Sequence, residues 1–120
     1  MAKVLIADSV AFERISLKDI FTKLGHEVVA EASNTNDLIK MYGNTNPDYV
    51  IMDIALSDSE GINSLKTLLK KYPEAKVCVC TAMAQQVTVI ESINAGAKDF
   101  VVKPYQANRI KQSIEKVLAE

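Results

Sequence analysis

The sequence predicts an α/β protein in which one doubly wound, parallel sheet of five strands carries helices on both faces. Three observations support this: five short apolar runs rich in β-branched residues, apolar residues at helical spacing after each run, and glycines or prolines where helices should end. Apolar runs that are continuous rather than alternating are typical of strands covered on both faces. Strands that alternate with helices through short connections indicate a parallel sheet.

The expected strands are short and contain almost no charged residues. They cover residues 4–7, 28–30, 49–52, 77–80 and 100–102. The fourth contains the two cysteines of the chain, Cys78 and Cys80, whose spacing points both to the same side of a strand. We interpret them as buried thiols in a reducing compartment rather than as a metal or redox pair.

Each expected helix is recognised by apolar residues three or four positions apart. The predicted buried positions are Phe12, Ile15, Ile20, Phe21 and Leu24 in the first helix, Leu38, Ile39 and Tyr42 in the second, Ile62, Leu65, Leu68, Leu69 and Tyr72 in the third, Val87, Ile90 and Ile93 in the fourth, and Ile110, Ile114, Val117 and Leu118 in the fifth. Gly25, Gly43 and Gly96 follow three of these stretches, where a left-handed C-terminal cap would place a glycine. Pro47 and Pro73 then lead to the third and fourth strands.

The composition argues against several classes of protein. We expect residues 1–120 to form one domain, because a chain of this length buries roughly two-thirds of its unfolded surface. No apolar run approaches the roughly twenty residues of a membrane-spanning helix. The chain passes from residues 1–3 directly into a strand-like run, so we expect no secretory signal and a cytoplasmic location. A formal net charge of −1 with 6% aromatic residues argues against nucleic acid as the main partner.

Polar side chains follow four of the five expected strands. Asp8 follows the first strand, Asp53 the third, Thr81 the fourth and Lys103 the fifth. Because the carboxyl ends of parallel strands meet at one edge of the sheet, we expect these four residues to lie together there. Each alone has an ordinary alternative, since the aspartates and the threonine could cap helices or turns and the lysine could extend into solvent.

Together the four residues favour a phosphoryl-transfer site. Two carboxylates at one edge repel each other unless a cation lies between them, and Mg²⁺ typically takes one or two protein carboxylates. Lys103 could neutralise one phosphate oxygen and Thr81 could hydrogen-bond another. Asp53 would be the nucleophile, because carboxylates form acyl phosphates.

The sequence resembles the receiver domains of two-component response regulators, and most of all the stand-alone CheY-type chemotaxis regulators. The similarity covers the chain from Lys3 to about Leu118 and is strongest in the segments 4–8, 52–54 with Gly61 downstream, 81–83 and 95–104. It implies a flavodoxin- and CheY-like (βα)5 fold and a phosphorylation-controlled signalling protein. It implies no enzymatic activity beyond self-phosphorylation and self-dephosphorylation.

The resemblance also implies a role for each residue at the sheet edge. Asp53 corresponds to the aspartate that accepts a phosphoryl group from a histidine kinase. Asp8 corresponds to an acidic residue that helps to hold Mg²⁺, and the backbone carbonyl of Ala55 to a further metal ligand. Thr81 and Lys103 correspond to the hydroxyl and the ammonium that bind the phosphoryl group.

A switch and a partner surface follow from the same resemblance. Phe100, which could also be an ordinary core residue, corresponds to the aromatic residue that turns inward as the hydroxyl of Thr81 moves. The fourth helix, fifth strand and fifth helix form the usual output face, where Phe100, Tyr105 and Lys98 are candidates. The implied partners are a chemotaxis-type histidine kinase and a flagellar motor switch component or a phosphatase, and the chain would be a monomer. Family members often have a cis bond at the position of Lys103–Pro104.

The metal site departs from the family at Ser9. The family usually carries there a second acidic residue that binds Mg²⁺ directly, whereas serine could bind only weakly or through a water molecule. Two remaining carboxylates can suffice for Mg²⁺, so we expect weaker metal binding and slower phosphorylation but not their loss. Glu13, four residues later, could supply a replacement carboxylate or could be an exposed charge.

The loop after the acceptor departs as well. Ser57 stands where the family favours a proline, so we expect a less rigid loop over residues 55–60. Asp58 and Glu60 add acidic groups that could compensate for the missing ligand. After Thr81, the side chains of Met83, Gln85 and Gln86 could gate access to the site or could be ordinary solvated loop residues.

Three other functions are alternatives to this one. A degenerate receiver would bind its partner without phosphorylation, as Ser9 and the missing proline suggest. A phosphatase of the haloacid-dehalogenase type would need an aspartate where Val10 stands. A flavodoxin would need a phosphate loop rich in Gly, Ser or Thr after the first strand, which residues 8–12 lack.

Overall fold

A computed structural model describes residues 1–59, 62–82 and 86–120, without the side chains of Gln86 and Val87. The expectations for Glu60, Gly61 and 83–85, and for the side chains of Gln86 and Val87, lie outside the described residues. Strands and helices alternate along the chain: β1 (Lys3–Ala7), α1 (Ala11–Lys23), β2 (Glu27–Ala32), α2 (Thr35–Thr45), β3 (Tyr49–Asp53), α3 (Asn63–Lys71), β4 (Val77–Thr81), α4 (Gln86–Asn94), β5 (Asp99–Val102) and α5 (Ala107–Leu118).

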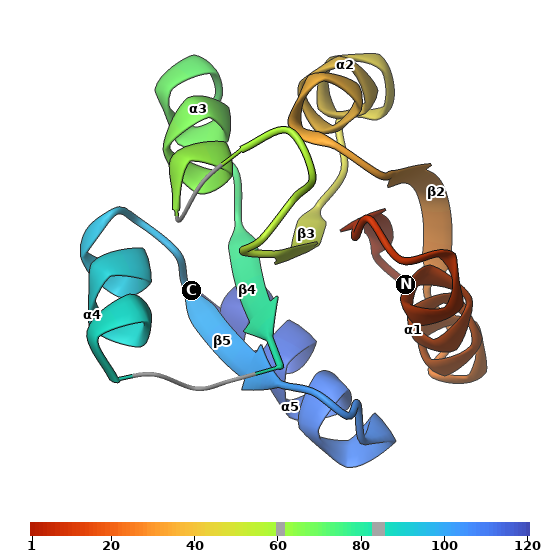
Figure 1. The fold of residues 1–120 in the computed structure, drawn as a ribbon. Coiled ribbons are helices and arrows are strands. Elements are labelled where there is room, and N and C mark those ends of the chain that lie inside the picture. The colour runs from red at the N-terminus through yellow and green to blue at the C-terminus, as the bar shows by residue number, and fades with distance from the viewer. Residues whose placement is uncertain (60–61, 83–85) are drawn as a thin grey trace.

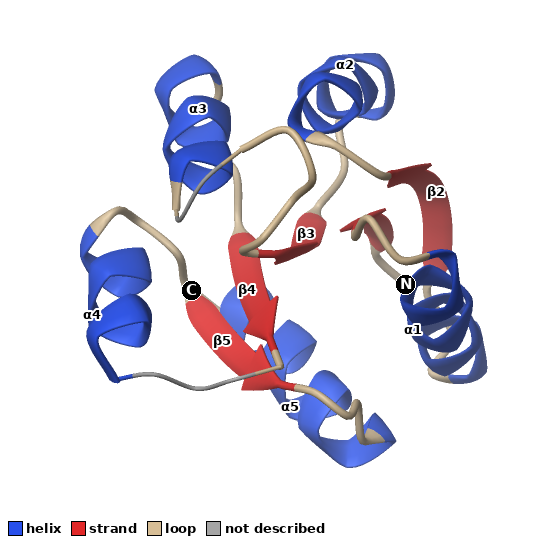
Figure 2. Ribbon diagram, in the orientation of Figure 1, coloured by secondary structure: helices blue, strands red, loops and turns tan. Residues whose placement is uncertain are grey.

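The five strands form one sheet in the order β2-β1-β3-β4-β5, and every neighbouring pair is parallel. Helices α1 and α5 cover one face of the sheet, and α2, α3 and α4 lie on the other (Figures 1 and 2). The predicted doubly wound α/β fold is therefore confirmed. No helix within the described part of the chain is long and apolar enough to cross a membrane.

Alternate residues of the central strands feed two separate cores. Leu5 and Val50 pack with residues of α2 and α3, whereas Ile6 and Ile51 pack with residues of α1 and α5. Both faces of β1 and β3 are thus apolar, which explains why these strands appear in the sequence as continuous runs. Cys78 and Cys80 are buried, free and on the same face as Ile6, as predicted.

The predicted core face of α1 is wrong at its first two positions. Phe12 and Ile15 are 74% and 65% exposed, whereas Leu17 and Phe21 are fully buried. At 3.6 residues per turn, positions 17, 20, 21 and 24 share one side of the helix, and positions 12 and 15 lie on the other side. The apolar residues of α1 therefore include two that the sheet does not cover.

The predicted core face of α4 is wrong at Ile90 and Ile93, whereas the side chain of Val87 lies outside the described residues. Ile90 and Ile93 are 49% and 43% exposed, and the buried side chain among the described residues of this helix is that of Ser92. The Ser92 hydroxyl donates a hydrogen bond of 2.8 Å to the carbonyl of Thr88, which makes its burial tolerable. Isoleucine side chains on α4 consequently face outward.

The predicted glycine caps hold for two helices and fail for the third. Gly25 and Gly96 have positive φ angles of 89° and 117° after α1 and α4. Gly43 instead lies inside α2, and Asn46, with φ of 47°, is the left-handed residue at its end. A Cβ atom on Gly43 would lie 2.6 Å from the hydroxyl oxygen of Tyr72, so the glycine permits close packing of α2 on the residue after α3.

An ion pair between Arg109 of α5 and Asp99 of β5 links these two elements. The Arg109 guanidinium donates to both carboxylate oxygens of Asp99, at 3.1 and 3.2 Å, and to the carbonyl of Phe100 at 2.6 Å. Burial alone would raise the pKa of Asp99, but the hydrogen bonds from Arg109, the backbone N–H of Phe100 and Ser113, together with the charge of Arg109, outweigh it and hold that pKa below its usual value. The pair therefore stabilises the fold while Asp99 is ionised.

We expect Arg109→Met to lower the free energy of unfolding at pH 7 by about 2 kcal/mol, because it leaves the buried Asp99 carboxylate without its main partner. The depressed pKa of Asp99 means that the stabilisation is complete above the ordinary value of about 3.9 and disappears as the pH falls through the folded-state pKa. Urea unfolding at pH 7 and pH 3 measures both effects. Lys116→Met is the control, because Lys116 is 57% exposed and lies 3.7 Å from the same carboxylate. A deficit in R109M that is equally large at pH 3 would contradict this account.

Candidate functional site

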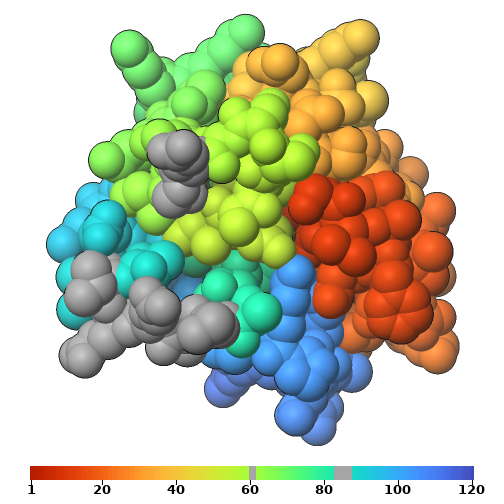
Figure 3. Space-filling model, viewed as in Figure 1, coloured from red at the N-terminus to blue at the C-terminus, as the bar shows by residue number. Residues whose placement is uncertain are grey.

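The strand ends bring three of the four predicted residues into direct contact. Asp53 ends β3 and Thr81 ends β4, whereas Asp8 and Lys103 come directly after β1 and β5. The segments that carry Asp8, Asp53 and Lys103 meet on one face of the molecule (Figure 3). Thr81 is half-buried at the same edge, where its carbonyl accepts the backbone N–H of Lys103 at 2.8 Å.

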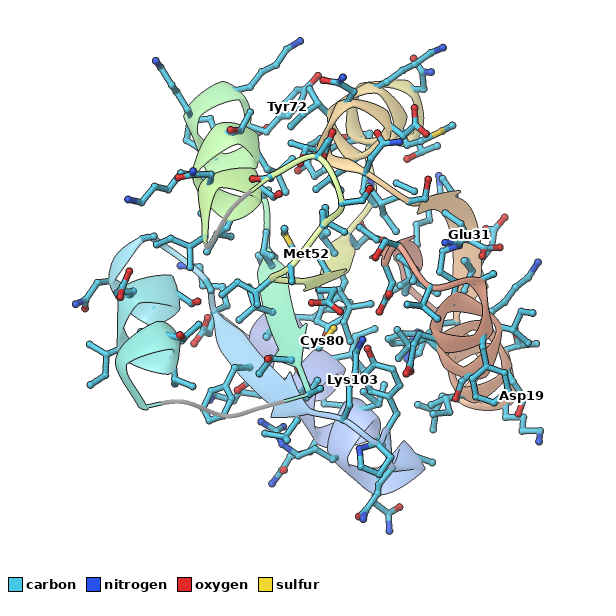
Figure 4. The ribbon with its side chains drawn as sticks, viewed as in Figure 1. Asp19, Glu31, Met52, Tyr72, Cys80 and Lys103 are labelled. Atoms are coloured by element: carbon cyan, nitrogen blue, oxygen red, sulfur yellow. The ribbon has the colours of Figure 1, made fainter. Side chains whose placement is uncertain are left out.

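The Lys103 ammonium lies between the two carboxylates. Its Nζ atom is 2.6 Å from Oδ2 of Asp53 and 2.9 Å from Oδ2 of Asp8. The side chain of Asp8 is fully buried, and those of Asp53 and Lys103 are 13% and 11% exposed. Figure 4 shows Lys103 close to Cys80, the residue paired with Asp53 across the sheet. A cation thus separates the two acidic groups, and it is supplied by the chain itself.

The two aspartates hold Lys103 in its charged form. Burial alone would lower the pKa of Lys103, but hydrogen bonds and charge attraction from Asp53 and Asp8 raise it well above its usual value. The lysine is therefore an ammonium at neutral pH and offers its protons to the acceptor carboxylate.

Backbone amides orient the remaining carboxylate oxygens. Oδ1 of Asp8 accepts the N–H of Val10 at 2.9 Å, and Oδ1 of Asp53 accepts the N–H of Ala55 at 2.8 Å. The Arg14 guanidinium donates to the carbonyl of Asp8 at 2.6 Å. In each carboxylate, Oδ1 is therefore bonded to a backbone N–H of the loop that follows it, and Oδ2 is bonded to Lys103.

The predicted supplementary ligands lie around this pair. Ser9 is exposed in the connection between β1 and α1, and Ala55 is exposed just after β3. Glu13 is half-buried in the first turn of α1, one turn before Leu17 and on the same side. The ion pairs found among the described residues do not include Glu13.

The donor set is small for a metal site. Within residues 1–59, 62–82 and 86–120, no group of three or more His, Cys, Asp or Glu residues could hold a metal ion. Asp8 and Asp53 nevertheless supply two carboxylates that contact the same ammonium, and Mg²⁺ is often held by one or two carboxylates while it keeps several waters. The two carboxylates are therefore enough to hold Mg²⁺, but they offer little negative charge. One oxygen of each is already bonded to Lys103.

Tyr105 is an anchor that the sequence did not reveal. Its hydroxyl donates to Sγ of Cys80 at 3.0 Å, which joins the β5–α5 connection to β4 next to Thr81. Burial raises the pKa of Tyr105, so the hydroxyl keeps its proton for this bond. The peptide bond between Lys103 and Pro104 is cis, as predicted. The only sequence signal for the anchor is an aromatic residue two positions after Lys103.

The loop after Asp53 makes a contact with α2 that the sequence did not predict. Ser57 does replace the expected proline, but the carboxylate of Asp58 accepts backbone N–H groups at the start of α2, from Thr35 at 2.7 Å and Asn36 at 3.3 Å. The hydrogen bond from Thr35 holds the pKa of Asp58 below its usual value. Asp58 is thus engaged with α2, and the idea that it replaces a metal ligand finds no support in its contacts.

Comparison with known proteins agrees with this geometry. Residues 4–115 match the family model described as the response regulator receiver domain. The chain is 49% identical over 115 residues to the chemotaxis protein CheY of Thermotoga maritima and 46% identical over 116 residues to that of Bacillus subtilis. These alignments cover 96% and 97% of this chain, and the same shares of the two relatives. Among solved structures, the CheX-CheY-BeF3-Mg²⁺ complex from Borrelia burgdorferi contains a chain with a TM-score of 0.92 and 28% identity, covering 98% of this chain and 90% of that one.

We expect Lys103→Met to bind Mg²⁺ more tightly than the wild type, because the ion no longer competes with an ammonium for the two carboxylates. The variant should lose stability without metal, by about 2 kcal/mol, since the buried Asp8 is left without its counter-charge. The measurement is the thermal midpoint during a Mg²⁺ titration, and Lys66→Met on the exposed side of α3 is the control. If Mg²⁺ raised the midpoint of the wild type more than that of K103M, the competition would be disproved.

Proposed function

The chain belongs to the response regulator receiver domain family, and on that premise we propose that it is a phosphorylation-controlled signalling domain that accepts a phosphoryl group on Asp53. We propose that residues 1–120 act as one receiver domain in the cytoplasm. The domain catalyses only its own phosphorylation and dephosphorylation. The observation that carries the proposal is the contact of Lys103 with both Asp53 and Asp8.

The proposed reaction transfers a phosphoryl group from a phosphohistidine of a kinase. A carboxylate oxygen of Asp53 forms a bond to phosphorus while the bond between phosphorus and the histidine nitrogen breaks, which yields an acyl phosphate. The Lys103 ammonium, 2.6 Å from Oδ2 of Asp53, pairs with a phosphoryl oxygen after transfer. The hydroxyl of Thr81 at the end of β4 binds another.

Asp8, Asp53 and the carbonyl of Ala55 are the residues that would hold Mg²⁺. When bound, the ion neutralises charge on the transferring phosphoryl group. Ser9 contributes at most a weak contact or a bridge through water, so we propose weaker Mg²⁺ binding than a second acidic residue would give. Glu13 is half-buried in the first turn of α1, and its carboxylate is a second candidate to replace the missing acidic ligand.

The output surface is proposed to lie on α4, β5 and α5. Phe100 is half-buried and packs against the core cluster that contains residues of α2 and α3. Near it, Ile90, Ile93 and Val102 expose 49%, 43% and 41% of their surface. Phosphoryl charge that draws Thr81 and Lys103 together would favour an inward position of Phe100 and shift the population that binds a partner.

The proposed partners are proteins of chemotaxis signalling. A chemotaxis-type histidine kinase would supply the phosphoryl group, and a flagellar motor switch component or a phosphatase would bind the phosphorylated domain as a monomer. The relatives named CheY and the complex that contains CheX support this class of partner. Nucleic acid is not among the proposed partners.

A second candidate function is a receiver that binds its partner without phosphorylation. It is favoured by Ser9, which removes an acidic ligand, and by the contact of Lys103 with both carboxylates, which already offsets one of their two negative charges. The two functions differ in whether Asp53 ever carries a phosphoryl group.

Incubation with Mg²⁺ and a small phosphodonor such as acetyl phosphate should add one phosphoryl group to the wild type, as seen by intact mass. Asp53→Asn should abolish the adduct, because an amide is not a nucleophile for phosphorus. Asp48→Asn is the control, because Asp48 accepts the N–H of Lys3 at the other end of the strands, and this variant should still gain the phosphoryl group. The absence of any adduct over a wide range of Mg²⁺ concentrations would favour the second candidate function.

Ser9→Asp should lower the Mg²⁺ concentration for half-maximal phosphorylation by about tenfold, because one more carboxylate strengthens a site of hard oxygen ligands. Glu13→Gln tests whether the Glu13 carboxylate replaces the missing ligand. If it does not, this variant should need the same Mg²⁺ concentration for half-maximal phosphorylation as the wild type. Phosphorylation rates over a Mg²⁺ titration provide both values. An S9D variant that needs as much Mg²⁺ as the wild type would refute the proposed metal deficit.

A further inference from the structure

The loop that follows the acceptor is tied to a helix from another part of the chain. One carboxylate oxygen of Asp58 accepts a hydrogen bond from the N–H of Thr35 at 2.7 Å, and the other accepts one from the N–H of Asn36 at 3.3 Å. These amides begin α2, where the first N–H groups of a helix have no partner within the helix. Asn34 caps only the amide of Asp37, at 2.8 Å. Figure 1 shows the connection between β3 and α3 passing beside the start of α2.

A second contact joins the start of α2 to the helix beyond the loop. The hydroxyl of Thr35 lies 2.7 Å from that of Ser64 in the first turn of α3, and these residues are 8% and 0% exposed. Thr35 therefore contacts the loop through its backbone and α3 through its side chain. Asp58 is exposed, and among the hydrogen bonds of the described residues it alone connects the loop to α2.

Asp58 also occupies a tight turn beside the acceptor. The N–H of Ser59 donates to the carbonyl of Leu56 at 3.1 Å, which closes a turn with Ser57 and Asp58 at its two central positions. Leu56 is 2% exposed and belongs to the core cluster around α2 and α3. Directly before it, Ala55 donates its N–H to Oδ1 of the acceptor Asp53. The position of the turn thus sets the position of the backbone that holds the acceptor carboxylate.

The first central position of such a turn is the place where proline is favoured, because proline fixes φ near −65°. Here that position is Ser57, and its backbone contributes no such constraint. We propose that Asp58 is a positioning residue for phosphorylation of Asp53: its carboxylate clamps the turn over residues 56–59 to the start of α2 and holds Ala55 against the acceptor, in the role that a proline at position 57 would otherwise fill. This inference rests on the proposed function.

The experiment compares Asp58→Ala with the double variant S57P/D58A. D58A removes the clamp, and we expect it to slow phosphorylation by acetyl phosphate about tenfold at saturating Mg²⁺, because misplaced catalytic groups lose rate. Amide exchange at Thr35 and Asn36 should also become faster by about tenfold or more. S57P/D58A should recover phosphorylation toward the wild-type rate while these two amides still exchange quickly. Within the described residues the amide of Ser57 donates no hydrogen bond, so proline removes none there.

Asp48→Ala is the matched control. The carboxylate of Asp48 accepts the backbone N–H of Lys3 at 2.8 Å, a bond of the same kind at the other end of the strands. D48A should lose a comparable amount of stability without slower phosphorylation and without faster exchange at Thr35 and Asn36. This comparison separates positioning from a general loss of stability.

Three outcomes would overturn the inference. The first is a D58A variant with unchanged exchange at Thr35 and Asn36, because the clamp would then not form in solution. The second is a D58A variant that exchanges these amides quickly but is phosphorylated at the wild-type rate, or an S57P/D58A variant that is phosphorylated no faster than D58A. The third is a wild type that takes up no phosphoryl group, which would defeat the proposed function and the positioning role together. Amide exchange would still report the clamp in that case, so the two failures are distinguishable.

Discussion

The contact of one ammonium with two carboxylates is the interaction on which the rest of this site depends. Asp8 is fully buried, and a buried carboxylate without a counter-charge is costly. Lys103, which follows β5, provides the charge and at the same time links the segment after β1 to the last residue of β3. The same contact places a proton donor on the acceptor, so the feature that stabilises the sheet edge also prepares its chemistry.

The sheet order explains why these residues meet. β1 lies between β2 and β3, so the chain leaves it through α1 on one face and returns from β2 through α2 on the other. The crossovers diverge at the carboxyl ends of β1 and β3, which is the place where open α/β sheets generally bind their ligands. Asp8 and Asp53 stand at these two ends, where backbone amides of Val10 and Ala55 orient their second oxygens.

Hydrogen bonds hold the chain on both sides of Lys103. On one side Arg109 of α5 holds the carboxylate of Asp99 and the carbonyl of Phe100, and on the other side Tyr105 donates its hydroxyl to Cys80. The residues between these attachments run from the half-buried Phe100 to the lysine in the site. A change in the contacts of Lys103 therefore acts on a short stretch of chain fixed at both ends, next to the apolar surface of α4 and β5.

The sequence by itself determined the fold class, the strand positions and the four residues at the strand ends, because covered strands, helical spacing and parallel topology leave periodic signals. Only the tertiary structure decided which apolar residues are covered: Phe12 and Ile90 have the residue type of core positions but lie on the outer sides of their helices. It also decided that Asp58 bonds to α2 and that Tyr105 bonds to Cys80. Such contacts join residues more than twenty positions apart, and the local pattern around either residue contains no trace of its partner.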